Sequence, residues 1–168
     1  MRKLMVLCSM LLCSAAFLPQ NASAKEIKDV ATAKKLAKEK VASSTVTDVD
    51  IDHKGSSRVY EVDLLKGNRE YELTYKASNG KLLKYEWERM KKPNNGNDQE
   101  LTKKEIRSLA KKRINHASIQ SIHFDYDDGI PEYKVKLKKN HKRYTLVYHG
   151  STGKLLEYKW ELKKYKSL

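Results

Sequence analysis

The chain has 168 residues, of which 33% are charged, with a formal net charge of +14 and a mean hydropathy of −0.76. Beyond its first residues, no apolar stretch approaches the ~20 residues that a membrane-spanning helix needs, which excludes a multi-span membrane protein. Its two cysteines, Cys8 and Cys13, fall within residues 1–24. The rest of the chain therefore has no thiol for a disulfide, a metal or nucleophilic catalysis.

Residues 1–24 have the order of a secretory signal peptide. Two basic residues precede an apolar run from Leu4 to Phe17, and the small residues Ala22-Ser23-Ala24 follow. We expect cleavage near Ala24 and a secreted or extracytoplasmic protein, in the cell envelope or beyond it. A lipid anchor is disfavoured because Leu7 and Leu12, rather than small residues, precede the cysteines.

A first domain is predicted over residues 25–89. It opens with an amphipathic helix, because Val30, Ala33, Ala37 and Val41 recur at steps of three and four residues. The period then changes to two, which is typical of half-buried strands, and turns that contain Gly, Ser or Asn separate the segments. We expect four strands, near residues 46–52, 58–65, 70–76 and 82–88.

A linker over residues 90–98, rich in Asn and containing Pro and Gly, leads to a second domain over residues 99–168. This domain repeats the first. The octapeptide KLLKYEWE at residues 81–88 returns as KLLEYKWE at residues 154–161, and the offset of 73 holds without a gap from the helix to the last strand. Duplication of one unit is the economical explanation.

The second helix has a start signal, since Thr102 and Glu105 form a capping-box pattern. An antiparallel sheet with one apolar face needs a cover, and the helix of each copy is the available one. The predicted fold class is therefore α+β, with two tandem units, each an N-terminal helix packed on a four-stranded antiparallel sheet. Aromatic residues of the last strands should supply much of the two cores: Trp87, Trp160, Tyr85 and Tyr158.

The end of each copy resembles the PepSY family. It has an aromatic residue, a turn and then Gly-Lys-Leu-Leu, in residues 75–83 and 148–156, with Gly80 and Gly153 where a turn favours positive φ. Neither copy has the family's aspartate before the turn. The resemblance implies a PepSY or cystatin-like fold. PepSY domains occur in propeptides of thermolysin-like metalloproteases, where they help to inhibit and fold the enzyme, and in small exported proteins without an enzyme.

The sequence contains no catalytic constellation, and we expect neither enzyme activity nor a cofactor nor a metal. It lacks a serine nucleophile motif, an H-E-x-x-H helix and a phosphate-binding glycine loop. His123, His141 and His149 lack metal-ligand spacing and are interpreted as surface residues. The D-x-D-x-D row at residues 48–52 resembles the start of a calcium loop. Its glycine and glutamate are misplaced, however, and its alternation predicts a solvated strand face.

The excess of basic residues is concentrated in the second copy. Residues 25–88 have 13 basic and 12 acidic side chains, whereas residues 99–168 have 17 and 8. Such charge attracts anionic surfaces, although it also serves solubility. The candidate residues for binding an anionic surface are Lys111, Lys112, Arg113, Lys134, Lys136, Lys138, Lys139, Lys142 and Arg143.

Two functions follow as hypotheses. The first, implied by the resemblance, is a non-catalytic protein-binding module that modulates or inhibits a secreted or envelope protease, such as a metalloprotease, or another extracytoplasmic protein. The second, drawn from the charge, is a basic binder of anionic wall polymers or lipid headgroups. Nucleic acid is not an expected partner of an exported protein whose tyrosines follow the apolar phase of its strands.

Overall fold

The protein forms two helices and eight strands in a computed structural model that describes residues 26–90 and 100–163. The predicted signal peptide and most of the predicted linker lie outside the described residues. In chain order the elements are α1 (Val30–Lys40), β1 (Thr45–Lys54), β2 (Ser57–Lys66), β3 (Arg69–Lys76), β4 (Leu82–Arg89), α2 (Lys103–Arg113), β5 (Ser118–Asp127), β6 (Ile130–Lys139), β7 (Lys142–His149) and β8 (Leu155–Leu162).

Local capping explains where each helix begins. The Asp29 side chain accepts a hydrogen bond from the Thr32 amide at 2.7 Å, which satisfies a free donor in the first turn of α1. In α2 the predicted capping box is confirmed, because the Glu105 amide donates to the Thr102 hydroxyl and the Glu105 carboxylate accepts from the Thr102 amide. Each helix buries its apolar stripe on the sheet.

The expected eight strands are present, and the two copies match even in their irregularities. β1 has a bulge between Val46 and Asp48, and β5 has one between Ile119 and Ser121, which are the equivalent positions. A second pair of matching bulges lies in β4 and β8, where Leu83 and Leu156 are the extra residues opposite Thr74/Tyr75 and Val147/Tyr148. Bulges bend a strand and increase its twist, so the duplication preserved the curvature of each unit as well as its core.

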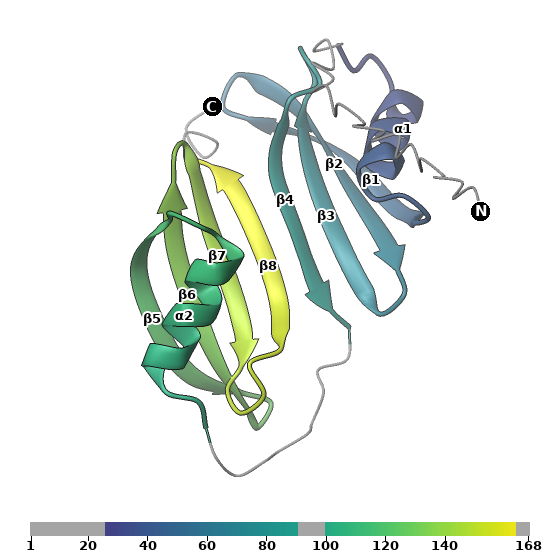
Figure 1. The fold of residues 1–168 in the computed structure, drawn as a ribbon. Coiled ribbons are helices and arrows are strands. Elements are labelled where there is room, and N and C mark those ends of the chain that lie inside the picture. Colours follow the sequence, from purple (N-terminus) through teal and green to yellow (C-terminus); the bar gives the residue numbers. More distant parts are fainter. Residues whose placement is uncertain (1–25, 91–99, 164–168) are drawn as a thin grey trace, which may run out of the picture.

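The prediction of two separate four-stranded sheets is wrong in one respect. β4 and β8 pair antiparallel, and the chain forms a single eight-stranded sheet in the order β1-β2-β3-β4-β8-β7-β6-β5 (Figure 1). The physical reason is that β4 and β8 would otherwise each leave a row of backbone donors and acceptors unpaired at a sheet edge. We call residues 26–90 the first half and residues 100–163 the second half.

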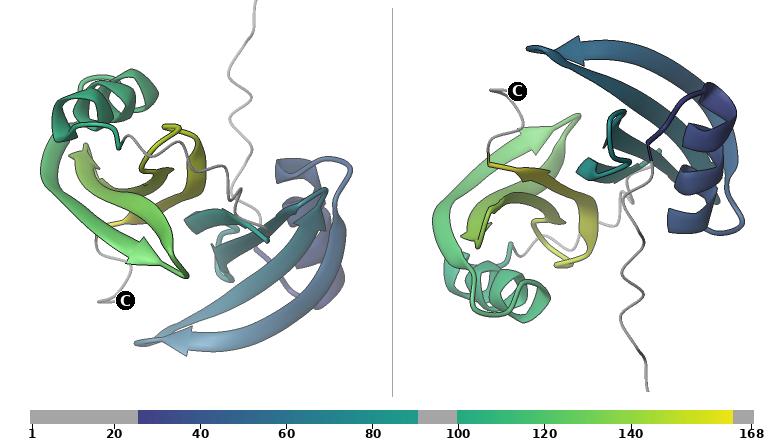
Figure 2. Two further views of the ribbon diagram at one scale, coloured as in Figure 1. Left: turned by 90° about the horizontal axis from the view of Figure 1, so that it is seen from below. Right: turned by 90° about the horizontal axis from the view of Figure 1, so that it is seen from above.

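Both helices cover the same face of this sheet. Each packs with its own half around a separate core (Figure 2). A chain of edge-to-face ring contacts joins the two cores across the β4–β8 junction, with ring centroids 6.1 to 6.4 Å apart, through Tyr71, Tyr85, Tyr158 and Tyr144. The opposite side of the sheet, which no described helix covers, is called the helix-free face below. Within the described residues, no helix is long and apolar enough to cross a membrane.

Candidate functional site

An internal dyad relates the two halves. β4 and β8 pair in a register that places Glu86 directly opposite Lys159. These residues are equivalents, 73 positions apart, so the halves are related by an approximate twofold axis through this pair. The Lys159 Nζ lies 2.8 Å from the Glu86 Oε2. The junction of the sheet is therefore closed by an ion pair between two copies of one ancestral position.

The helix-free face of the first half is acidic. Strand alternation and register place a row of carboxylates side by side across β1 to β4, formed by Asp48, Asp63, Glu72 and Glu86. Partial burial, and then repulsion from Glu72 and Asp48, raises the pKa of the Asp63 carboxyl. Burial is the larger cause of this rise, and repulsion from the neighbouring carboxylates of the row adds to it.

Lys84 is the main internal counter-ion of this row. Its ammonium group forms ion pairs with Glu72 and, at 2.8 Å, with Glu86. Burial alone would lower the pKa of Lys84, but the hydrogen bonds and charges of the two glutamates outweigh it and raise the pKa. For Glu86, burial is likewise outweighed by Lys159 and Lys84, and its pKa is lowered. These groups stay ionised and fix the centre of the face.

Exposed cations line β6 on the helix-free face of the second half. Continuing the central row past Lys159 leads to Thr145, Lys136 and Ser121. Lys134, Lys136 and Lys138 are exposed on this face of β6, whereas Arg143 pairs with Glu161 at 3.0 Å. Four carboxylates of the first copy have become cations at the equivalent positions on this face: Glu61 to Lys134, Asp63 to Lys136, Glu70 to Arg143, and Glu86 to Lys159.

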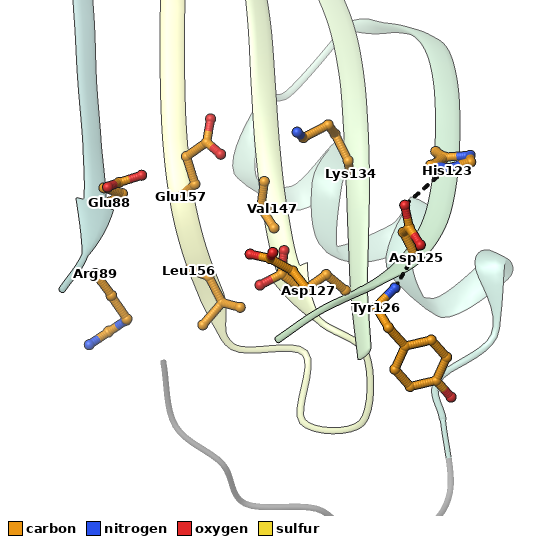
Figure 3. A pocket seen from close by; sticks show the side chains of 11 residues that line it. Glu88, Arg89, His123, Asp125, Tyr126, Asp127, Lys134, Val147, Leu156 and Glu157 are labelled. Carbon is orange, nitrogen blue, oxygen red and sulfur yellow. Dashed lines mark hydrogen bonds and ion pairs between the residues drawn. The ribbon is translucent and has the colours of Figure 1, made fainter. Parts of the chain in front are cut away.

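A pocket of about 330 Å³ opens on the helix-free face of the second half (Figure 3). Glu88, Glu157, Val147, Lys134 and His123 point to the same side of their strands in Figure 3 and line it together with the residues near the β5–β6 turn. Burial, followed by repulsion from Glu86, raises the pKa of Glu157. The pocket is thus a polar depression in a charged surface.

A substitution between the copies explains why the equivalent position in the first half is filled by an apolar side chain. In the first half, Leu162 crosses from β8 and packs against Val59 and Leu83. Their equivalents across the internal dyad are Arg89 of the first half and Glu132 and Leu156 of the second, which line the pocket. Arg89 donates from its Nε to the Leu155 carbonyl at 3.2 Å, whereas the equivalent Leu162 packs as an apolar side chain.

The structure divides the predicted anion-binding residues between the two faces. Lys134, Lys136, Lys138 and Arg143 lie on the helix-free face. The other five lie on the helix side or at its rim: Lys111, Lys112 and Arg113 end α2, the Lys139 Nζ donates to the Asn115 carbonyl at 2.7 Å, and the Lys142 Nζ lies 3.5 Å above the Trp160 ring. A single continuous patch is not formed.

The predicted structural residues occupy the expected positions. Gly80 and Gly153 have φ values of +64° and +66°, and Trp87 and Trp160 are 5% and 9% exposed. Tyr85 and Tyr158 are half-buried at the junction between the cores. The sequence patterns did not indicate Asp63, Glu72, Glu86 or Lys159 as site residues. Their signal was the reversal of charge between equivalent positions, which net charge alone does not show.

The three histidines of the second copy do not converge. His123 lies on β5, 3.8 Å from the Asp125 carboxylate, and His141 is exposed in the β6–β7 turn. The interpretation of all three as surface residues is wrong for His149, which is 1% exposed and whose Nδ1 accepts from the Ser151 amide. Over the described ranges, no three His, Cys, Asp or Glu side chains are grouped so as to hold a metal ion.

A family model described as "Peptidase propeptide and YPEB domain", PepSY, matches residues 27–86 and again residues 100–159. The chain belongs to the PepSY family. The resemblance seen in the two Gly-Lys-Leu-Leu segments is confirmed, and this PepSY protein contains two tandem copies. No curated protein matches the chain.

Among solved structures, the PepSY chain is similar to three bacterial proteins of low sequence identity. A Clostridium difficile 630 protein described as a candidate lipoprotein is 19% identical, with a TM-score of 0.36, covering 82% of this chain and 96% of that one. The Bacillus megaterium YpeB C-terminal domain is 11% identical, with a TM-score of 0.45 and coverages of 84% and 66%. A Staphylococcus aureus cysteine-rich secretory protein is 16% identical, with a TM-score of 0.40 and coverages of 86% and 50%.

Proposed function

We propose that this PepSY protein is an exported, non-catalytic binding protein that uses its helix-free face to bind and modulate a partner protein, foremost a secreted or envelope protease. The observation that carries the proposal is the charge reversal at four equivalent positions, from Glu61, Asp63, Glu70 and Glu86 to lysine or arginine. Together these changes place cations on the second half of a face whose first half carries a row of carboxylates.

A face of this kind suits a folded protein better than a uniform polyanion. Lys134, Lys136 and Lys138 would attract a polyanion, but one long enough to cross the sheet would meet the carboxylate row of the first half. A protein can present basic groups to that row and acidic groups to β6. Complementary charge of this kind steers encounter and selects among partners. The description of the family as a peptidase propeptide domain makes a protease the first partner to test.

The test uses the chain from Lys25 to the C-terminus and a panel of purified secreted metalloproteases. The expected result is slower hydrolysis of a large protein substrate at stoichiometric concentration, with a complex visible by size exclusion. Lys136→Glu should reduce the association rate about tenfold and change the dissociation rate less, because exposed charges mainly steer encounter. The matched control is Lys35→Glu, which makes the same charge change at an exposed position of α1.

The outcomes separate the parts of the proposal. Absence of both inhibition and complex formation across the panel would remove the protease as partner. An equal effect of Lys136→Glu and Lys35→Glu would show that net charge, rather than the helix-free face, governs binding.

A further inference from the structure

A second charged surface lies on the opposite side of the sheet, where the C-terminal ends of α1 and α2 approach the junction. Arg69 lies over the Trp87 ring at 4.1 Å, and its equivalent Lys142 lies over the Trp160 ring at 3.5 Å. Arg113 lies 5.9 Å from the Tyr158 ring. Lys40 is near enough to Lys142 for its charge to act on that side chain. Cations from both halves therefore surround the junction tyrosines.

A groove of about 550 Å³ opens beside these cations. Its lining includes Arg113, Lys139, His141, Lys142, Tyr144 and Tyr158, and none of the described residues that line it is acidic. The contrast with the helix-free face is sharp, because each of the two pockets there has five carboxylates in its lining. Anionic ligands are therefore favoured in this groove over the two pockets of the helix-free face.

Both copies have cations at these equivalent positions, whereas the charge is reversed at other equivalent positions. Lys40, Lys66 and Arg69 of the first copy correspond to Arg113, Lys139 and Lys142 of the second. Part of this retention is structural, since Lys66 and Lys139 donate to equivalent carbonyls, those of Ala42 and Asn115, at 2.6 and 2.7 Å.

Hydrogen bonds of this kind do not explain why the other cations are present in both copies. Lys40 and Arg113 are exposed helix ends, and within the described ranges neither they nor Lys142 pairs with a carboxylate. Burial, and then repulsion from Lys40, lowers the pKa of Lys142. The like charges are thus held together at a cost that a bound anion would relieve.

We propose that this groove, with its equivalent set of cations across the internal dyad, binds a segment of a phosphate-bearing linear polymer. Two sets of cations related by the dyad can contact successive phosphates of one strand, and the half-buried tyrosines between them offer apolar surface to the linking groups. A lipid surface fits less well, because the exposed large apolar side chains of the described chain, Ile51, Met90 and Tyr126, do not line the groove.

The experiment measures binding of inorganic polyphosphate, monomeric phosphate and phosphatidylglycerol vesicles to the full chain by calorimetry. The double variant Arg113→Gln/Lys142→Gln should weaken polyphosphate binding about tenfold or more. The control Lys134→Gln/Lys136→Gln removes the same charge from the helix-free face and should change binding less than about twofold. Weaker dependence of binding on salt is expected only for the groove variant, since it loses contacts that release counter-ions.

Folding is controlled by two further variants. Arg113→Gln alone changes an exposed side chain and should still weaken polyphosphate binding, although less than the double variant does. Lys142→Arg keeps the cation above Trp160 and should bind polyphosphate nearly as tightly as the original chain does. Equal losses for the two double variants would reduce the effect to net charge and overturn the proposal. Vesicle binding as tight as polyphosphate binding, or no binding of polyphosphate, would also overturn it. None of these outcomes depends on whether the helix-free face binds a protease.

Discussion

Glu86 and Lys159 stand at the same position of the duplicated unit, yet they carry opposite charges and form an ion pair 2.8 Å long. Their side chains are 19% and 29% exposed, so the pair is partly desolvated. In a symmetric dimer of an undiverged unit, this position would meet itself, and like charges would oppose each other at the centre of the sheet. A change of this residue in a single copy converts that repulsion into attraction.

A double-mutant cycle should detect this pair. With Glu86→Gln, Lys159→Gln and the double variant, we expect a coupling energy of about 1 kcal/mol in denaturant unfolding, which is within the usual range for contacting residues. The exposed pair His123 and Asp125 serves as the control, with side chains 71% and 79% exposed. His123→Gln and Asp125→Asn should couple by less than about 0.3 kcal/mol. Equal coupling energies would show that the junction pair stabilises the protein no more than an exposed pair does.

Asp63 predicts a dependence of stability on pH. Its folded pKa is raised by burial and by Glu72 and Asp48. The native state then binds a proton more tightly than the unfolded chain, so stability is lost as pH rises from the ordinary value of 3.8 through the folded pKa. Asp63→Asn should accordingly raise the Tm at neutral pH. The advantage should vanish below about pH 3.8.

Salt supplies the control for this change. Because repulsion between exposed carboxylates is screened, the gain in Tm from Asp63→Asn should shrink between about 0.1 M and about 1 M salt. A variant that is less stable than the original chain at neutral pH would show that Asp63 makes a favourable contact outweighing the repulsion.

Much of each unit was predictable, because side-chain periodicity is a local property. The apolar steps from Val30 to Val41 predicted α1, and the alternation from Leu83 to Trp87 predicted β4. The joining of β4 to β8 was not predictable in this way. An edge strand and an inner strand of this sheet share the same alternation, and no short turn fixes the register between Glu86 and Lys159.

The candidate site was hidden for a related reason. Counting charge over residues 25–88 gives nearly equal numbers of acidic and basic side chains, although the fold separates them onto different surfaces. Asp63 and Glu72 become neighbours only when β2 and β3 pair. Comparing equivalent positions of the two copies would have revealed the reversal, for example of Asp63 to Lys136.

The turn before β8 should tolerate substitution less than a turn of the same backbone conformation elsewhere. Gly153 and Gly67 both have positive φ, but an added Cβ at Gly153 would lie 2.9 Å from Leu109 Cδ1, whereas Gly67 has open space. Gly67→Ala should cost about 1 to 2 kcal/mol through backbone strain alone. Gly153→Ala should cost more, as measured by denaturant unfolding. Costs in the reverse order would show that the contact with Leu109 is easily relieved.

Asparagine provides a further comparison at the Gly67 turn. The equivalent residue in the second half is Asn140, which adopts a φ of +54°. Gly67→Asn should therefore destabilise the protein less than Gly67→Ala does, because asparagine tolerates the left-handed region better than alanine.

The two halves should assemble as a specific heterodimer when they are produced as separate chains, residues 25–90 and residues 99–168. Each half alone exposes the unpaired edge of β4 or β8, and pairing them restores both the backbone hydrogen bonds and the contacts of Trp87 with Tyr158. A homodimer in the same register would instead oppose Glu86 to Glu86 or Lys159 to Lys159. Light scattering and calorimetry should show a mixed dimer at least about tenfold tighter than either homodimer.

Changing Glu86→Lys in the first half should abolish the preference, and adding Lys159→Glu in the second half should restore it. Folded halves that remain monomeric when mixed would contradict the β4–β8 junction itself. Homodimers as tight as the mixed dimer would leave the junction intact and deny the charge pair its role in choosing partners.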